Sequence, residues 1–176
     1  MLFLGTMSWG PNAAAAKFLI ETFPKLRARF PDARLDIVGR DPPPELKAMG
    51  NRPGVEVTGG VPDVKPYLAR ASLLAVPLDA GGGTRLKILE AFAAGLPVVS
   101  TAVGAEGIEA IANTHFIRAE RSGLVEAMAN LLESPGEAMQ LATAARVLAR
   151  DVYDWSRIGR KAVDAIQMLG SRSRLV

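Results

Sequence analysis

Short apolar runs of strand composition alternate with segments of helical pattern along the chain as far as Arg118. The strand-like runs are LFL (2–4), RLDIV (34–38), VEV (55–57), LLAVP (73–77), PVVS (97–100) and HFI (115–117). Strands that alternate with helices in this way form βαβ units, in which the strands lie parallel. The pattern therefore predicts an α/β fold, with a Rossmann-like parallel sheet of about six strands flanked by helices.

The helical segments carry apolar residues at helical spacing and have start and stop signals. Pro11 suits the first turn of a helix, Asp63 is placed to cap another, and Gly95 with Pro97 closes a third. The expected helices cover residues 11–30, 63–71, 86–94, 123–132, 137–150 and 156–169. The last three have no strands between them, so they predict a helical C-terminal extension, and residues 171–176 are expected to form a frayed tail.

Length and composition limit the class of protein. The 176 residues are enough to bury a core, and we expect a single domain over residues 1–176. The absence of cysteine excludes a disulfide framework and a thiol nucleophile, and it agrees with a cytoplasmic location. We recognise neither an apolar run of the ~18 residues typical of a membrane span nor a signal peptide. The net charge of +3 comes from scattered residues, which disfavours nucleic acid and suits a small anionic ligand or an anionic membrane surface.

Three glycines and a helix start follow the fourth strand-like run, where open parallel sheets bind their ligands. Gly81, Gly82 and Gly83 carry no side chain that would keep a ligand from the backbone, and the helix start presents free N–H groups nearby. Thr84 is placed to cap the helix or to donate to a phosphate, and Arg85 to form a paired hydrogen bond to phosphate oxygens. The segment predicts an anion site, with a flexible loop before a capped helix as the alternative.

Lys87 and Glu90 interrupt the apolar pattern of the same helix and lie on one face of it. A carboxylate in this position can accept two hydrogen bonds from the vicinal hydroxyls of a ribose, as in dinucleotide-binding folds. An ordinary exposed Lys–Glu pair explains the same spacing. The residues alone leave both interpretations open.

Several segments, in order and spacing, resemble the C-terminal domain of retaining GT-B glycosyltransferases of the group 1 family. The most specific is GGGTRLKILEAFAAGLPVVST (81–101), preceded by FLGTMSWGPNAAAAKFL, RFPDARLDIVGR and VEVTGGVPDVKPYLARA. The resemblance covers nearly the whole chain. It implies one half of a GT-B architecture that binds a nucleotide-diphosphate sugar, while a separate N-terminal acceptor-binding domain is absent from this chain.

The resemblance further implies a hexosyltransferase-type glycosyltransferase as the full-length protein, with an unknown acceptor. The implied role is the synthesis of a glycan, a lipid-linked saccharide or a cell-surface polysaccharide. We expect this chain alone to be inactive, because transfer requires an acceptor held near the anomeric carbon. The full-length protein is expected in the cytoplasm, with a possible peripheral contact at the inner face of the membrane.

The resemblance also assigns donor-site residues. Glu90 matches the second acid of the family's Glu-x7-Glu motif, which holds the ribose hydroxyls, whereas Gly82 stands where the first acid is expected. No catalytic residue is therefore assigned. The candidates for donor binding in this segment are Gly81, Gly82, Gly83, Thr84, Arg85, Lys87 and Glu90.

The loop after the first strand is a second departure from the family. Many relatives carry an Arg and a Lys there to clamp the diphosphate, whereas this chain has GTMSWGPN from Gly5 onward. Gly5 is counted among the donor-binding residues. Arg85 is then the first candidate to meet the phosphate charge and Arg40 the next. Val61 and its neighbours in GGVPD resemble the loop whose backbone reads the nucleotide base.

Other functions stay open at this point. A noncatalytic nucleotide-sugar-binding or scaffold module is suggested by Gly82 and the missing half. A nicotinamide-binding domain or a sugar-nucleotide epimerase-like domain is disfavoured because GTMSWG departs from G-x-G-x-x-G. The single histidine, His115, has no neighbouring ligand cluster, so neither a metal nor a cofactor is expected. An apolar surface left by the missing half predicts self-association of the fragment.

Overall fold

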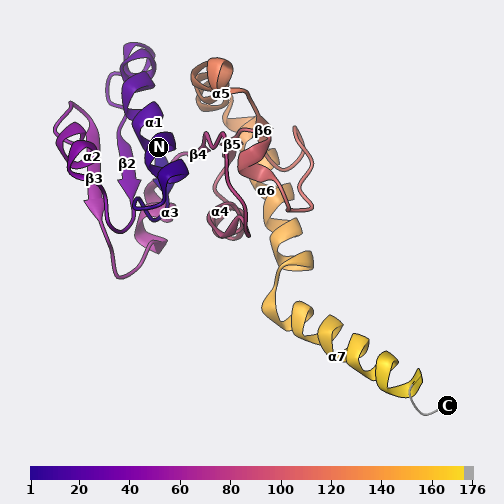
Figure 1. Ribbon diagram of the computed structural model, residues 1–176. Coiled ribbons are helices and arrows are strands. Elements are labelled where there is room, and N and C mark those ends of the chain that lie inside the picture. The colour runs from indigo at the N-terminus through magenta and orange to yellow at the C-terminus, as the bar shows by residue number, and fades with distance from the viewer. Residues whose placement is uncertain (173–176) are drawn as a thin grey trace.

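The strands form one open sheet in which every neighbouring pair is parallel (Figure 1). The computed structural model describes residues 1–172, with side chains as far as Gln167 except that of Lys161, and residues 173–176 lie outside the description. The six strands are β1 (Leu2–Leu4), β2 (Leu35–Val38), β3 (Val55–Gly59), β4 (Leu74–Val76), β5 (Val98–Ser100) and β6 (Ile117–Arg118). Their order, β3-β2-β1-β4-β5-β6, confirms the predicted Rossmann-like sheet. Strands β2 and β3 are added on one side of β1, and β4, β5 and β6 on the other, so the strand order reverses between β1 and β4 while all strands stay parallel.

Four of the strands are buried along their whole length: β1, β2, β4 and β5. Helices cover both faces of a parallel sheet, so its inner strands are mostly apolar and do not alternate; the polar exceptions here are Asp36 and Ser100. This burial explains why the strands were recognisable as continuous apolar runs. The last strand is the least regular, because it pairs only at Ile117 and Arg118, later than the predicted 115–117.

The helices agree with the predicted pattern and add two short ones. The helical elements are α1 (Gly10–Arg29), α2 (Pro44–Met49), α3 (Lys65–Arg70), α4 (Leu86–Ala94), η1 (Val103–Ala105, a 3-10 turn), α5 (Arg121–Glu133), α6 (Pro135–Val152) and α7 (Trp155–Arg172). Helix α1 packs against α2 and α5, while α4 packs against α3 and α6. Neither α2 nor η1 was predicted.

Two predicted helix ends can be compared with the structure. Gly95 closes α4 in a left-handed conformation with φ 71°, which glycine adopts at low cost. Asp63 accepts a hydrogen bond from the N–H of Lys65 at 3.0 Å, so it satisfies a free amide at the start of α3. The helix itself begins at Lys65, two residues later than expected.

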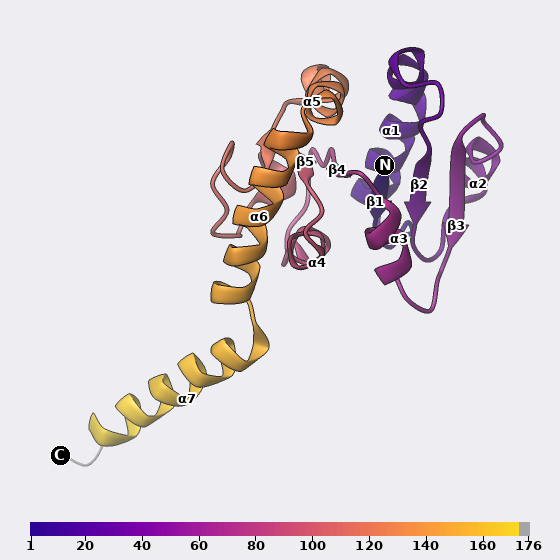
Figure 2. The same cartoon turned by 180° about the vertical axis from the view of Figure 1, so that it is seen from behind.

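Helix α7 leaves the body of the domain and extends away from the sheet in both views (Figures 1 and 2). It packs against α6 at its start. Of the tail predicted to be frayed from residue 171, residues 171 and 172 belong to α7, and the remainder lies outside the described residues. Within residues 1–172, no helix combines the length and the hydropathy that crossing a bilayer requires.

The loops that follow β1 and β2 touch through their backbones. Gly5 donates its N–H to the carbonyl of Val38 at 3.1 Å, and Gly39 donates to the carbonyl of Gly59 at 3.0 Å. A Cβ atom added at Gly39 would lie 1.6 Å from the carbonyl oxygen of Gly5. Position 39 therefore excludes every side chain, and the loops after β1, β2 and β3 are held in a fixed relation.

We predict that Gly39→Ala lowers the free energy of unfolding by more than about 2 kcal/mol, because backbone atoms must move to admit the methyl group. The control is Gly123→Ala in α5, where an added Cβ meets nothing within 4 Å. That change should alter the unfolding free energy by less than about 1 kcal/mol, in the stabilising direction. Urea denaturation measures both. Equal stability of the two variants would contradict the close contact at Gly39.

Candidate functional site

The carboxyl ends of the strands gather most of the predicted site residues at one edge of the sheet. Gly5 follows β1, Arg40 follows β2 and Val61 follows β3, and the backbone N–H of Met7 donates to the carbonyl of Arg40 at 2.7 Å. A Cβ atom on Gly60 would lie 3.0 Å from Cγ of Arg40, so that side chain is adjacent to the loop after β3. The structure thus brings these three candidates together, next to the point where the strand order reverses.

The glycine segment follows β4 on the other side of this reversal. Gly81 and Gly83 have φ angles of 145° and 83°, and an atom added at Gly82 or Gly83 would meet nothing within 4 Å. Gly82, Gly83 and Thr84 are exposed. The backbone here is therefore exposed, with open space beside Gly82 and Gly83. Thr84 does not cap α4, because Arg85 occupies the N-cap position and no side chain bonds to the first turn.

Trp9 connects the two sides of the reversal and was not predicted as a site residue. A Cβ atom on Gly81 would lie 2.5 Å from Cη2 of its indole, so the ring rests on the glycine backbone. The side chain is still 39% exposed and can contact a ligand in the same place. Trp9 could have been identified as a site residue from the sequence, because it is a large aromatic residue in the glycine-containing loop after the first strand.

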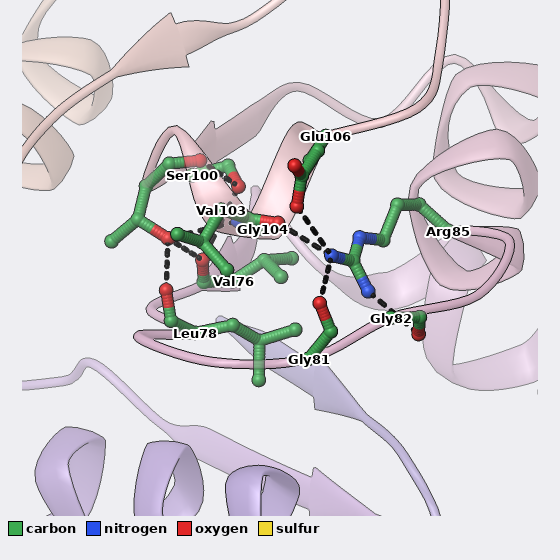
Figure 3. A network of polar contacts seen from close by, with 10 residues as sticks. Val76, Leu78, Gly81, Gly82, Arg85, Ser100, Val103, Gly104 and Glu106 are labelled. Atoms are coloured by element: carbon green, nitrogen blue, oxygen red, sulfur yellow. Dashed lines mark hydrogen bonds and ion pairs between the residues drawn. The ribbon is translucent and has the colours of Figure 1, made fainter.

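The guanidinium of Arg85 is directed inward, toward backbone carbonyls (Figure 3). Only 5% of the residue is exposed. Its Nη1 donates to Gly82 at 3.1 Å, and its Nη2 donates to Gly81 at 3.1 Å and to Val103 at 2.8 Å. Arg85 thus holds the glycine segment against η1, whereas the sequence predicted a paired hydrogen bond to phosphate oxygens.

Two hydroxyl groups fix η1 on the other side of Arg85. Thr101 donates to the carbonyl of Leu78 at 2.5 Å and accepts from the N–H of Gly104 at 3.1 Å. Ser100 donates to the carbonyl of Val76 at 3.2 Å. Figure 3 shows these bonds between the ends of β4 and β5. The loops after the two strands therefore form one hydrogen-bonded unit with the glycine segment.

Glu106 comes directly after η1, and its Oε2 lies 3.6 Å from Nη2 of Arg85. Its side chain is 70% exposed, in contrast to that of Arg85. Figure 3 shows the carboxylate directed toward the guanidinium. Local sequence patterns do not single out this glutamate, because the contact joins residues 21 positions apart.

Lys87 crosses from α4 to the loop after β1. Its Nζ donates to Oδ1 of Asn12 at 2.7 Å and lies 4.6 Å from the ring centroid of Phe3. Asn12 in turn donates to the carbonyl of Thr6 at 3.0 Å. Burial lowers the pKa of Lys87 to about 8, and the positive charge of Arg85 contributes in the same direction.

Glu90 lies on the exposed side of α4, and partial burial raises the pKa of its carboxyl. Together with Thr84 and Leu86 it lines a groove of about 1000 Å³ whose opposite wall includes Tyr153 and Trp155. Among the residues described, no ion pair joins Glu90 to Lys87. The simple surface pair that explained their spacing is therefore not formed, and Glu90 is left with its carboxylate toward solvent.

Metal-binding chemistry finds no support in the described part of the chain, where no group of three or more His, Cys, Asp or Glu residues is suitably placed. His115 accepts a hydrogen bond from the N–H of Ile111 through Nδ1 at 2.9 Å, which gives it a local role in its loop. The chemistry available at the edge of the sheet is the binding of an anion and of hydroxyl groups.

Comparisons with known proteins identify the family of the chain. The sequence profile of the family described as "Glycosyl transferases group 1" matches residues 1–134. A GDP-mannose-dependent alpha-(1-6)-phosphatidylinositol monomannoside mannosyltransferase from Mycolicibacterium smegmatis is 29% identical over 164 aligned residues, which cover 84% of this chain and 43% of that protein.

Two solved structures show the same fold. Anabaena HepE in complex with UDP has a TM-score of 0.76 and 17% identity, over 95% of this chain and 48% of HepE. The C-terminal domain of LpcC, a group 1 family protein from Francisella tularensis, has a TM-score of 0.66 and 16% identity, over 88% of this chain and 84% of that domain. The chain thus spans less than half the length of the mannosyltransferase and of HepE.

The lowered pKa of Lys87 predicts how stability depends on pH. The unfolded chain, with an ordinary lysine pKa of 10.5, binds more protons than the folded chain between about pH 8 and pH 10.5, so the burial penalty falls as the pH rises. Relative to Lys87→Met, wild type should gain about 2 kcal/mol of unfolding free energy between pH 8 and pH 10. Urea denaturation at several pH values measures the difference. Parallel pH profiles for the two proteins would show that Lys87 titrates normally.

Proposed function

Because the chain belongs to the group 1 glycosyltransferase family and has the fold of its GT-B C-terminal domains, we propose that it binds a nucleotide-diphosphate sugar. The proposed site lies at the carboxyl edge of the sheet, between the loops that follow β1, β3 and β4. In the full-length protein this domain would supply the sugar donor for transfer to an acceptor held by another domain.

The observation that carries the proposal is the concentration of positive charge at the start of α4. The positive charge of Arg85 contributes to lowering the pKa of Lys87, and the first turn of α4 adds free N–H groups and a partial positive charge. In the described residues the single carboxylate paired with Arg85 is that of Glu106, at 3.6 Å. A diphosphate next to the exposed glycine backbone would relieve this imbalance.

Separate groups would hold the other parts of the donor. Glu90 carries an exposed carboxylate one turn farther along α4, where two vicinal ribose hydroxyls can donate to it. The backbone around Val61 would contact the base, and Gly5 would allow the ligand to approach the loop after β1. Arg40 is the exposed cation next to these loops, and it replaces Arg85 as the first candidate for a direct phosphate contact.

The relatives support a nucleotide-sugar donor without fixing the base. The mannosyltransferase is named for GDP-mannose, and HepE was solved with UDP. We propose hexose transfer by the full-length protein, in the synthesis of a glycan, a lipid-linked saccharide or a surface polysaccharide. The retaining outcome, the cytoplasmic location and a peripheral membrane contact stay predictions of the family resemblance.

A second candidate function is a binding module that does not transfer sugar. It is favoured by Gly82, which provides no carboxylate where the family carries its first acid. The same positive cluster would bind the nucleotide in either case. Addition of a cognate N-terminal domain distinguishes the two, because only a transferase half would then show sugar transfer.

Glu90→Ala should weaken nucleoside diphosphate binding by about tenfold, because two charge-assisted hydrogen bonds to the ribose are lost. Isothermal calorimetry with GDP and UDP measures the affinity. Glu21→Ala is the control, since Glu21 is an exposed glutamate on α1, and its affinity should equal that of wild type. No heat with either nucleotide on wild type would overturn the proposed function, and unchanged binding by Glu90→Ala would remove Glu90 from the site.

The chain alone should release no sugar from GDP-mannose or UDP-glucose above the rate without protein. Transfer depends on an acceptor hydroxyl fixed near the anomeric carbon, which can contribute about 7–11 kcal/mol to catalysis. Chromatographic detection of nucleoside diphosphate tests this expectation. Turnover by the isolated chain would show that the second domain is not needed for the chemical step.

A further inference from the structure

Arg85 is a buried cation that reaches two loops at once. Its Nη2 contacts the carbonyl of Gly81 after β4 and that of Val103 after β5, while its Nε is buried without a partner among the described residues. Three neutral carbonyls leave the positive charge uncompensated, and a buried charge requires a partner of opposite sign. Arg85 therefore attracts a carboxylate to this position.

The carboxylate that lies there belongs to Glu106. It stays 70% exposed although its Oε2 is 3.6 Å from Nη2 of Arg85, so most of its hydrogen-bonding capacity is free. The next residue is Gly107, with φ 81° and nothing within 4 Å of an added Cβ, so no side chain at that position covers the carboxylate. The carboxylate of Glu106 thus lies beside a buried cation and is open to a ligand.

The glycine segment contains no acidic side chain that could accept hydrogen bonds from a ligand. Gly82 has open space around it and offers only backbone atoms. Asp79, the nearest acid before it in the chain, is directed to Arg121 at the start of α5, with Oδ2 at 2.5 Å from Nη1. An acceptor for hydroxyl groups beside this segment must therefore come from another loop.

From this arrangement we infer that Glu106 recognises the hydroxyl groups of the donor's sugar, and that Arg85 is the residue that positions it. The inference rests on the proposed function. A carboxylate accepts hydrogen bonds from two neighbouring hydroxyls, as a sugar ring presents them, and repels the phosphates. The amides at the start of α4 favour the diphosphate, so Glu106 is matched to the sugar end of the ligand.

The test compares nucleotide-sugar binding with binding of the nucleotide alone. Calorimetry is done on the full chain with two ligand pairs, GDP with GDP-mannose and UDP with UDP-glucose. In Glu106→Gln, the affinity for the nucleotide sugar should fall about tenfold. The substitution removes the negative charge and replaces one of the two acceptor oxygens by an amide nitrogen, so the charge-assisted hydrogen bonds to the sugar hydroxyls are weakened or lost. The affinity for the free diphosphate should change by less than about twofold, since that part of the ligand is bound by other groups.

The matched control is Glu109→Gln, three residues farther along the same loop. Glu109 is exposed, and its backbone N–H donates to the hydroxyl of Tyr153 at 2.6 Å. This variant removes one negative charge from the same loop, as Glu106→Gln does. If the effect of Glu106→Gln arises from the position of its carboxylate, Glu109→Gln should bind both the free diphosphate and the nucleotide sugar as tightly as wild type. Thermal unfolding of both variants confirms that the fold is intact.

Two outcomes would overturn the inference, and they are distinguishable. If Glu106→Gln weakens the diphosphate and the nucleotide sugar equally, or neither, Glu106 does not read the sugar while the proposed function stands. If wild type binds none of the four ligands, the proposed function fails, and the inference fails with it.

Discussion

The parallel direction of all six strands determines which loops of this protein lie side by side. Every strand ends at the same edge, so the loops after β1, β2, β3 and β4 meet there although they are far apart in sequence. The reversal of strand order between β1 and β4 separates these loops into two groups. Contacts through Trp9 and Gly81 on one side, and through Lys87 and Asn12 on the other, then rejoin the groups.

The sheet and the helices followed from the sequence because their signals are local. Continuous apolar runs marked the buried strands, and Gly95 marked the end of α4 with the left-handed conformation that it adopts. Helix α2 was missed because it begins at the last of three consecutive prolines, which indicate a loop when only neighbouring residues are considered. The start of α3 was placed two residues early, at Asp63, whose carboxylate accepts from the N–H of Lys65, where the helix begins.

The site was only partly predictable, because its side chains are oriented by distant residues. An arginine at a helix start beside three glycines suggests a phosphate ligand. The guanidinium of Arg85 is instead held by the carbonyl of Val103, 18 residues later, and by Glu106. Likewise the partner of Lys87 is Asn12, 75 residues earlier, and spacing along one helix does not reveal such a contact. The sequence shows Gly82 at position 82, but which acid lies near the glycine segment depends on the fold.

The glycines at this edge differ in how much change they permit. Gly39 faces a backbone oxygen and Gly5 faces the buried amide of Asn12, so neither can acquire a side chain without displacing the loops. Gly82 and Gly83 border open space. In this chain, substitutions that leave the backbone in place are therefore expected at Gly82, at Gly83 and in the loop of Glu106, and not at Gly5 or Gly39. A search for altered specificity by mutagenesis would be most productive at those few positions.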